Sequence, residues 1–294
     1  MKRAAIVLCG GQSRRMGRPK ALLPWFGRTM IEHVLATLEG CVDERIVVTS
    51  EALSLGALAL AARIVVDREP ARGPLAALRD GLEATTAEQV FVTACDSPFL
   101  TVEHVEALFD RARTGSGAAA PVDEGIVQVL SAVYPGGAGR EAAALLAAGI
   151  SSPTALLERI GFDAVGRDAS GSAHARPGAA PWTGFNTPEA YLALARRRDP
   201  AATALVEWRR EDAIGGAETD VGRDGARAIG LGTVPIGRLD EVLERAVPPD
   251  ERLANGTLRV VLAEGELAPD ADGGLPIGPG EIVRVHESPR CGSR

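Results

Sequence analysis

The stretch Ala4-Ala5-Ile6-Val7-Leu8-Cys9, followed directly by Gly10-Gly11, decides the fold. Six apolar residues in a row are typical of a buried strand in a parallel sheet, and the two glycines predict a tight loop after it. Similar apolar runs predict strands at 45–49, 63–66 and 89–93. Helical patterns at 29–38, 74–84 and 101–113, and in the alanine- and leucine-rich segment before 63, separate them. This alternation predicts an α/β fold with a doubly wound, mostly parallel sheet.

The rest of the chain suggests two domains. Further strands are expected at 118–122 and 127–133, a loop at 168–183, and helices at 140–148, 154–160 and 188–198. Asp199-Pro200 then ends the last helix, so we expect one domain over residues 1–198, large enough to bury its own core. Residues 204–294 contain more Gly and Pro, one clear helix at 239–246 and strands that look short, such as 258–262 and 282–285. They predict a small α+β domain.

Composition excludes several classes of protein. Of 294 residues, 46% are hydrophobic and 24% charged, which excludes wholesale disorder. No apolar run reaches the roughly 18 residues of a membrane span, and the short run after Met1-Lys2-Arg3 resembles a strand more than a signal peptide. We therefore expect a cytoplasmic protein. The net charge of −7 argues against general nucleic-acid binding. Cysteines and histidines are scattered, which favours free thiols and offers no support for a histidine metal site.

The loop after the first strand carries the strongest chemical signal. Glycines let backbone N–H groups approach an anion, and Arg14, Arg15, Arg18 and Lys20 add positive charge. Only two of the 32 basic residues are lysines, so a lysine in this loop is notable. The loop lacks the G-K-[ST] of a P-loop and the Rossmann fingerprint. It predicts a phosphate site, with a solvated glycine-rich turn as the alternative.

Three other motifs also follow strands or begin helices. Asp96, after the strand at 89–93, is placed to hold Mg²⁺, although it could equally cap a turn. Asp67 could accept hydrogen bonds from a nucleoside, and Gly73-Pro74 begins a helix; the alternative is a plain loop. Gly184-Phe185-Asn186-Thr187-Pro188 is weak alone, because Asn-Thr-Pro is also an ordinary helix start.

In this order, the four motifs resemble the molybdenum cofactor guanylyltransferases of the MobA type. Positions 8–22 match the family loop Leu-Ala-Gly-Gly-x-Ser-x-Arg-Met-Gly-x-x-Lys-x-Leu except that Cys9 replaces Ala, and the resemblance covers about residues 1–198. It implies transfer of GMP from GTP to molybdopterin or the molybdenum cofactor, with release of pyrophosphate and Mg²⁺ as cofactor. Positioning and charge neutralisation suffice for this reaction, without a protein nucleophile.

The resemblance also implies roles for individual residues. Lys20, Arg15 and Asp96 would be catalytic, Lys20 neutralising the triphosphate. Asp96 would hold Mg²⁺, with Asn186 as a weaker candidate. Ser50 stands where the family commonly has Asn, which puts that nucleoside contact in doubt. The implied nucleotide-binding residues are Leu8, Cys9, Gly10, Gly11, Lys20, Ser50, Asp67 and Gly73.

The nucleotide and the acceptor leave alternatives. Gly10-Gly11 and Gly73-Pro74-Leu75 resemble the GTP-using branch, whereas the CTP-using branch tends to have alanine at position 10. The alternatives are a cytidylyltransferase using CTP, transfer to another acceptor such as a sugar phosphate, and a non-catalytic cofactor-binding or docking protein.

Residues from about 204 are distantly similar to the MoaD-type small subunit of molybdopterin synthase, a ubiquitin-like β-grasp protein. The matching stretches are 237–243, 258–267 and 275–285. Carrier activity in that family requires a Gly-Gly terminus, whereas the sequence here reads Gly292-Ser293-Arg294. We therefore expect no sulfur transfer, and instead docking on other proteins of cofactor synthesis. An unrelated α+β appendage is the alternative.

Overall fold

The computed structural model describes residues 1–10, 14–50, 55, 61–166, 179–211, 226–246, 256–262, 265–267 and 274–289. By their contacts the residues form two compact units. The first contains Met1–Ser13, Pro19–Leu22 and Thr29–Phe185, and the second contains Arg14–Arg18, Leu23–Arg28 and Asn186–Arg294. The glycine-rich loop is thus divided between the units. The predicted boundary between 1–198 and 204–294 as independent domains stays a prediction.

The first unit is built on a mixed, mostly parallel sheet, as predicted. Its strand order is β10-β7-β9-β6-β1-β4-β5, with β8 paired to β7. The four strands from β6 to β5 run parallel to one another, and β9 is antiparallel to both of its neighbours. The strands are β1 (Arg3–Cys9), β4 (Glu44–Thr49), β5 (Arg63–Val66), β6 (Gln89–Ala94), β7 (Ala119–Asp123), β8 (Ile126–Val127), β9 (Ser131–Pro135) and β10 (Asp163–Gly166).

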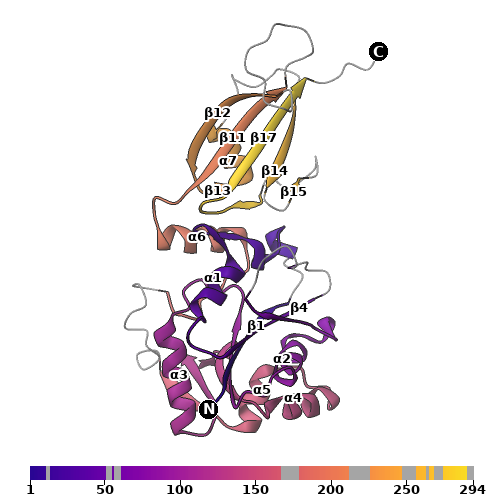
Figure 1. Cartoon of the computed structure of the whole chain (residues 1–294), viewed down its shortest axis with the longest axis vertical. Coiled ribbons are helices and arrows are strands. Elements are labelled where there is room, and N and C mark those ends of the chain that lie inside the picture. Colours follow the sequence, from indigo (N-terminus) through magenta and orange to yellow (C-terminus); the bar gives the residue numbers. More distant parts are fainter. Residues whose placement is uncertain are drawn as a thin grey trace. The chain divides into compact units, whose positions relative to one another are not determined.

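Helices cover both faces of this sheet. Figure 1 shows α3 (Val102–Thr114) on one side and α2 (Pro74–Glu83), α4 (Ala138–Ala147) and α5 (Pro153–Ile160) on the other. Because side chains alternate along a strand, β1 supplies both cores: Ile6 packs with the α2 side, and Val7 packs with α1 (Met30–Thr37) and α3. The predicted caps form, since the side chain of Thr29 accepts a hydrogen bond from the backbone of Glu32, and Thr101 accepts one from His104.

Two details of the first unit differ from the sequence expectation. The single strand expected at 127–133 is two strands, β8 and β9, because Gln128 turns the chain: Ser131 N donates to Gln128 O at 3.0 Å. A short hairpin of β2 (Pro24–Trp25) and β3 (Arg28–Thr29) was not expected. The helix predicted before residue 63 and most of the loop at 168–183 lie outside the described residues.

The second unit contains a five-stranded sheet in the order β12-β11-β17-β14-β15. Its central strands β11 (Thr203–Glu211) and β17 (Ile282–Pro289) are parallel, and the other pairs are antiparallel. The helix α7 (Leu239–Ala246), as predicted, packs its apolar side chains into the core of this sheet. The expectation of short strands was wrong for the main strands, since β11 has nine residues and β12 (Ala226–Pro235) has ten. The remaining elements are β14 (Gly256–Leu262), β15 (Gly265–Glu266), α6 (Pro188–Arg198), and the paired strands β13 (Gly237–Arg238) and β16 (Pro276–Ile277).

The β-grasp assignment of this sheet stays a prediction.

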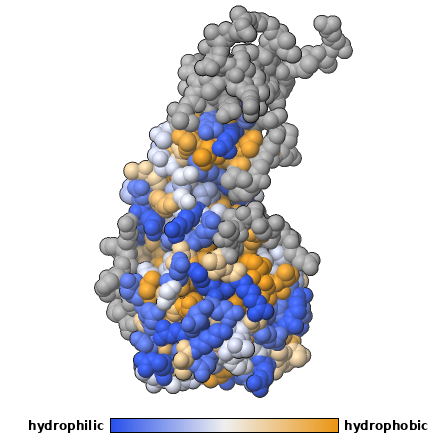
Figure 2. Space-filling view, viewed as in Figure 1, coloured by the Kyte–Doolittle hydropathy of each residue, from blue (hydrophilic) through white to orange (hydrophobic). Residues whose placement is uncertain are grey.

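Hydrophilic residues cover most of the face of the first unit that Figure 2 shows. Among the described residues, no helix has the length and hydropathy that a membrane crossing requires.

Candidate functional site

The carboxyl ends of four parallel strands bring predicted site residues to one edge of the sheet. Leu8 pairs with Ala94, Cys9 with Thr49, and Thr49 with Val66. Continuing this register aligns Asp96, Gly10, Ser50 and Asp67 in one row across β6, β1, β4 and β5, with neighbours about 4.8 Å apart. The ladder does extend past the strands, because Cys95 N donates to Leu8 O at 3.1 Å and Asp67 N to Thr49 O at 2.8 Å. Ligands of open α/β sheets bind at such an edge.

Lys20 joins this row through Asp96. The short helix η2 (Lys20–Leu22) returns the loop to the first unit, and Lys20 Nζ lies 2.6 Å from Asp96 Oδ2. The ammonium also lies 5.5 Å from the centroid of the Phe185 ring, within the range of a cation–π contact. Gly184 also packs against the aspartate: a Cβ there would lie 3.4 Å from Asp96 Cγ. The structure therefore brings together a cation and a carboxylate from two of the predicted motifs, and the Gly184-Phe185 start of a third.

Asp67 lies at the far end of the row and is buried. It accepts a hydrogen bond from Glu69 N at 2.9 Å, and burial raises the pKa of its carboxyl above the ordinary value. The following residue, Arg68, is fixed to α2, since its backbone N–H and its side chain both bind Asp80. Gly73 begins α2 at a φ of 85°, a left-handed conformation that favours glycine. The strand end and the helix start thus hold the Asp67 loop rigidly.

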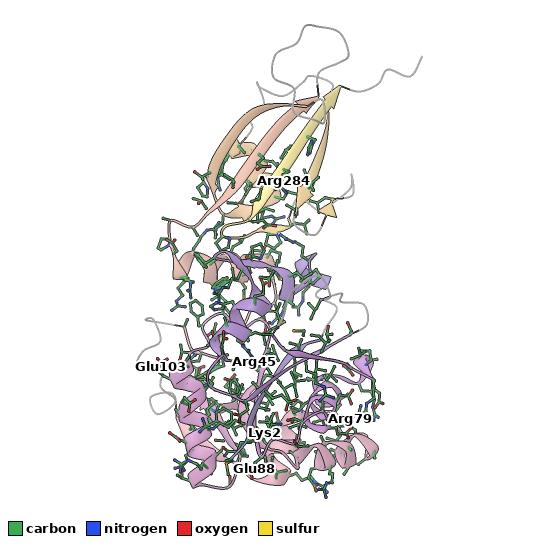
Figure 3. The ribbon with its side chains drawn as sticks, viewed as in Figure 1. Lys2, Arg45, Arg79, Glu88, Glu103 and Arg284 are labelled. Carbon is green, nitrogen blue, oxygen red and sulfur yellow. The ribbon has the colours of Figure 1, made fainter. Side chains whose placement is uncertain are left out.

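Asp80 is the centre of the ion-pair network behind this loop. Its carboxylate, which is almost fully buried, pairs with Arg68 and, at 2.8 Å, with Arg79. Burial alone would raise the pKa of Asp80, but hydrogen bonds from the two guanidinium groups outweigh it and hold the pKa below its ordinary value. Figure 3 shows Arg79 at α2.

Two cysteines directly precede residues of this row. Cys9 and Cys95 are buried, free, and part of the same core cluster. The side-chain hydrogen bond between Cys9 and Cys95, together with burial, raises the pKa of Cys9 well above the ordinary thiol value. Cys9 therefore stays neutral near pH 7, and both residues act as small packing residues beside Gly10 and Asp96.

Other predicted residues lie elsewhere or outside the described part of the chain. Arg18, expected among the phosphate-binding cations, is buried within the second unit, where its guanidinium pairs with Glu281. Arg15 is exposed on the 3-10 helix Arg14–Met16 of that unit, and Asn186 lies just before α6 there. Their predicted roles stay predictions. Gly11 lies outside the described residues, whereas Leu8 is buried and Ser50 half-buried at their strand ends.

Asp96 is the residue best suited to hold a metal. The described residues contain no group of three or more His, Cys, Asp and Glu that could form a protein-only metal site. A single, partly exposed carboxylate at a sheet edge instead suits Mg²⁺, which takes few protein ligands and completes its shell with water and phosphate oxygens. The Asp96 carboxylate therefore fits a metal ion that is bound together with a polyphosphate.

Comparison with known proteins shows the family of the chain. Residues 5–162 match the family model described as "MobA-like NTP transferase domain". A probable molybdenum cofactor guanylyltransferase of Bacillus cereus (strain Q1) is 33% identical over 136 residues, which are 45% of this chain and 68% of that protein. Another, of Haloferax mediterranei, is 36% identical over 137 residues, or 45% and 65% of the two chains.

Two solved structures show the same fold. Molybdopterin-guanine dinucleotide biosynthesis protein A of Archaeoglobus fulgidus is 22% identical and superposes with a TM-score of 0.53, over 64% of this chain and 94% of that one. A 2-C-methyl-D-erythritol 4-phosphate cytidylyltransferase of Thermus thermophilus is 20% identical, with a TM-score of 0.50 over 66% and 98%. Because one fold serves such different acceptors, the fold alone does not select the substrate.

Proposed function

The chain belongs to the MobA-like NTP transferase family, and from this premise we propose that it transfers GMP from GTP to the phosphate of molybdopterin, or of the molybdenum cofactor, with release of pyrophosphate. The observation that carries the proposal is the Lys20–Asp96 pair at the carboxyl edge of the parallel sheet, beside Gly10 in the strand register. One bond forms, between an oxygen of the acceptor phosphate and the α-phosphorus of GTP. One bond breaks, between the α-phosphorus and the bridging oxygen of the departing pyrophosphate.

The main obstacle to this reaction is the repulsion of two polyanions. The Lys20 ammonium, 2.6 Å from Asp96, would neutralise the triphosphate, and the backbone N–H groups of Gly10 and Gly11 would be further donors. Asp96 would hold Mg²⁺, which when bound neutralises phosphate charge and orients the phosphates. The work of the chain is to position and to neutralise, so neither Cys9 nor Cys95 is needed as a nucleophile.

The other end of the row would bind the nucleoside. The buried Asp67 carboxylate can accept hydrogen bonds from base or ribose donors, and Ser50 lies beside it in the register. Asp67 is held by Glu69 N and by the anchored Arg68, so its orientation is fixed before a ligand binds. Leu8, Cys9, Gly10 and Gly73 complete the proposed contacts.

Gly10 supports GTP over CTP. A Cβ built at this position meets no atom of the described residues within 4 Å, and its φ is not in the left-handed region. Neither packing nor backbone conformation therefore explains the glycine in the described structure. Close approach of a large base would explain the glycine at position 10, because the methyl group of an alanine would occupy space at the edge of the base. The CTP reaction is the alternative that this argument disfavours.

The test is to incubate the full chain with Mg²⁺, molybdopterin and either GTP or CTP, and to follow pyrophosphate and the mass of the product. We expect pyrophosphate with GTP, formed only in the presence of the acceptor, and a product carrying GMP. Faster release with CTP would reverse the choice of nucleotide. No release with either, despite measurable nucleotide binding, would favour the docking protein instead.

The predicted docking of other cofactor-synthesis proteins on residues 204–294 is a separate proposal. The full chain, used as bait, should capture a candidate partner in a pull-down. Adding an excess of the isolated partner should compete with this capture.

A further inference from the structure

A buried ion pair in the second unit involves a residue of the glycine-rich loop. Arg18 Nη2 lies 2.7 Å from Glu281 Oε1, and Nη1 donates a hydrogen bond to Oε2 at 3.1 Å, so two nitrogens of the guanidinium lie close to the carboxylate. Nη1 also donates to Pro276 O at 2.9 Å. The side chains are only 5% and 1% exposed. This is the environment of a fixed structural pair, since surface arginines that wait for a phosphate keep their guanidinium groups in water.

The surroundings of the pair are equally fixed. Glu281 Oε2 accepts a hydrogen bond from Gly278 N at 2.9 Å, which orients the carboxylate. Gly17, with a φ of 66°, lies so close to Leu275 that a Cβ would be 2.3 Å from Leu275 Cδ2. Gly17 and Arg18 therefore both contact the segment 275–281.

The pair is close to Lys20 along the chain. Only Pro19 separates Arg18 from Lys20, so their Cα atoms are at most about 7 Å apart by covalent geometry. Proline restricts the backbone of the residue before it as well as its own φ, so little freedom remains between the two positions. Fixing Arg18 therefore limits where the backbone of Lys20 can go.

We propose that Glu281 is a positioning residue for nucleotidyl transfer: it holds the Arg18 guanidinium and thereby restricts the backbone that leads to Lys20. This rests on the proposed function. Residues 204–294 then contribute to nucleotide binding through a group that acts on the loop and need not touch the nucleotide. Arg18 is already held before a ligand binds, so fixing this residue costs the ligand no affinity.

The test uses the full chain carrying Glu281→Gln, which keeps the shape of the side chain but removes its charge. We expect KM for GTP to rise about tenfold while kcat stays within about threefold, because an ordered loop supports binding in the ground and transition states alike. Hydrogen exchange of the amides at residues 14–18, measured without nucleotide, should become faster.

The matched control is the ion pair of Arg284 and Glu207 in the same unit, with 2.8 Å between Nε and Oε2; Figure 3 shows Arg284 on this sheet. Glu207→Gln removes a carboxylate of the same kind from β11 and should change neither KM nor the exchange of the loop.

A second variant guards against misfolding. Arg18→Lys keeps the charge but loses the planar fork, so it should fold and raise KM for GTP about threefold. A folded Glu281→Gln chain with KM within about twofold of the parent and unchanged loop exchange would overturn the proposal. So would failure of both variants to fold, which would make the pair a requirement of folding. Loop exchange needs no substrate, so it tests the anchor even if the parent chain releases no pyrophosphate and the proposed function fails.

Discussion

Arg18 and Lys20 are two basic residues of one short loop, and their surroundings differ sharply. Lys20 lies in the first unit, where its partly exposed ammonium pairs with a partly exposed carboxylate at the sheet edge. Arg18 lies in the second unit, where its guanidinium is enclosed with Glu281. The Lys20 and Asp96 side chains are 17% and 16% exposed, so exchanging partners with a ligand should cost this pair less than it would cost the pair of Arg18 and Glu281, where separation leaves buried charges unpaired. Within one loop, one cation thus keeps some contact with water and the other is enclosed, which is why we propose a chemical role for Lys20 and a structural one for Arg18.

The largest effect should come from the acidic partner on the Lys20 side. Asp96→Asn should lower nucleotidyl transfer by about a thousandfold, because a neutral amide is a poor ligand for Mg²⁺ and a weaker partner for Lys20. The measurement is pyrophosphate release over a titration of Mg²⁺. An activation curve equal to that of the parent chain would show that Asp96 is not the metal ligand.

Lys20→Ala should lower kcat/KM about a hundredfold with little loss of stability, since the side chain is partly exposed and developing phosphate charge loses a cation. Thermal unfolding checks the stability, and steady-state kinetics the activity. Together with Glu281→Gln, this variant tests the difference between Lys20 and Arg18, because Lys20→Ala should change kcat and Glu281→Gln mainly KM. Equal changes of kcat and KM in the two variants would contradict that difference.

Asp80→Asn tests a buried acid that belongs to the first unit and not to the loop. It should lower the free energy of unfolding by about 3 kcal/mol at pH 7, because two guanidinium groups lose their shared carboxylate. Urea unfolding with and without the substitution measures this difference.

The same variant carries a pH prediction. The folded pKa of Asp80 is below its unfolded value of about 3.9, so its contribution is complete above that value and is lost as pH falls through the folded pKa. The difference between the parent and Asp80→Asn should therefore shrink below about pH 4. A difference that stays constant to acid pH would contradict the assignment of the shift.

The smallest effect is expected at Cys9. Cys9→Ala removes one buried sulfur atom and its hydrogen bond with Cys95, so activity should stay within about threefold of the parent and stability should fall by about 1 kcal/mol. Because the thiol pKa is raised, the pH profile of transfer between about pH 6 and 8.5 should not change. A profile that loses a basic limb in the variant would give Cys9 a chemical role.

Local pattern was enough to predict the sheet edge. The runs that became β1, β4, β5 and β6 are continuous apolar segments, and parallel strands place their carboxyl ends together. That rule places Gly10, Ser50, Asp67 and Asp96 at one edge of the sheet, whereas their alignment in one row comes from the observed strand register. The sequence alone does not identify which charges face a ligand, because Arg18 and Lys20 carry the same charge and lie in the same loop.

The partner of Arg18 could not be read from the sequence near it. Glu281 is 263 positions away, beyond any local periodicity. One signal was present: Glu281 is an acidic residue in a stretch otherwise rich in Gly, Pro and apolar residues, and buried acids need a cation. The long strands β11 and β12 were missed for a related reason, since glycines in β12 resemble turn signals although they belong to a paired strand.

The separation of Arg18 from Glu281 also bears on how the protein is made. Residues 1–185 supply all the strands of the first unit's large sheet, so this sheet can form while the ribosome is still translating. The loop must wait, because its anchor emerges only after residue 281 has been added. Contacts of such high sequence separation form slowly, so ordering of the loop should be among the last steps of folding. A newly made chain would then acquire its sheet before its competence to bind nucleotide.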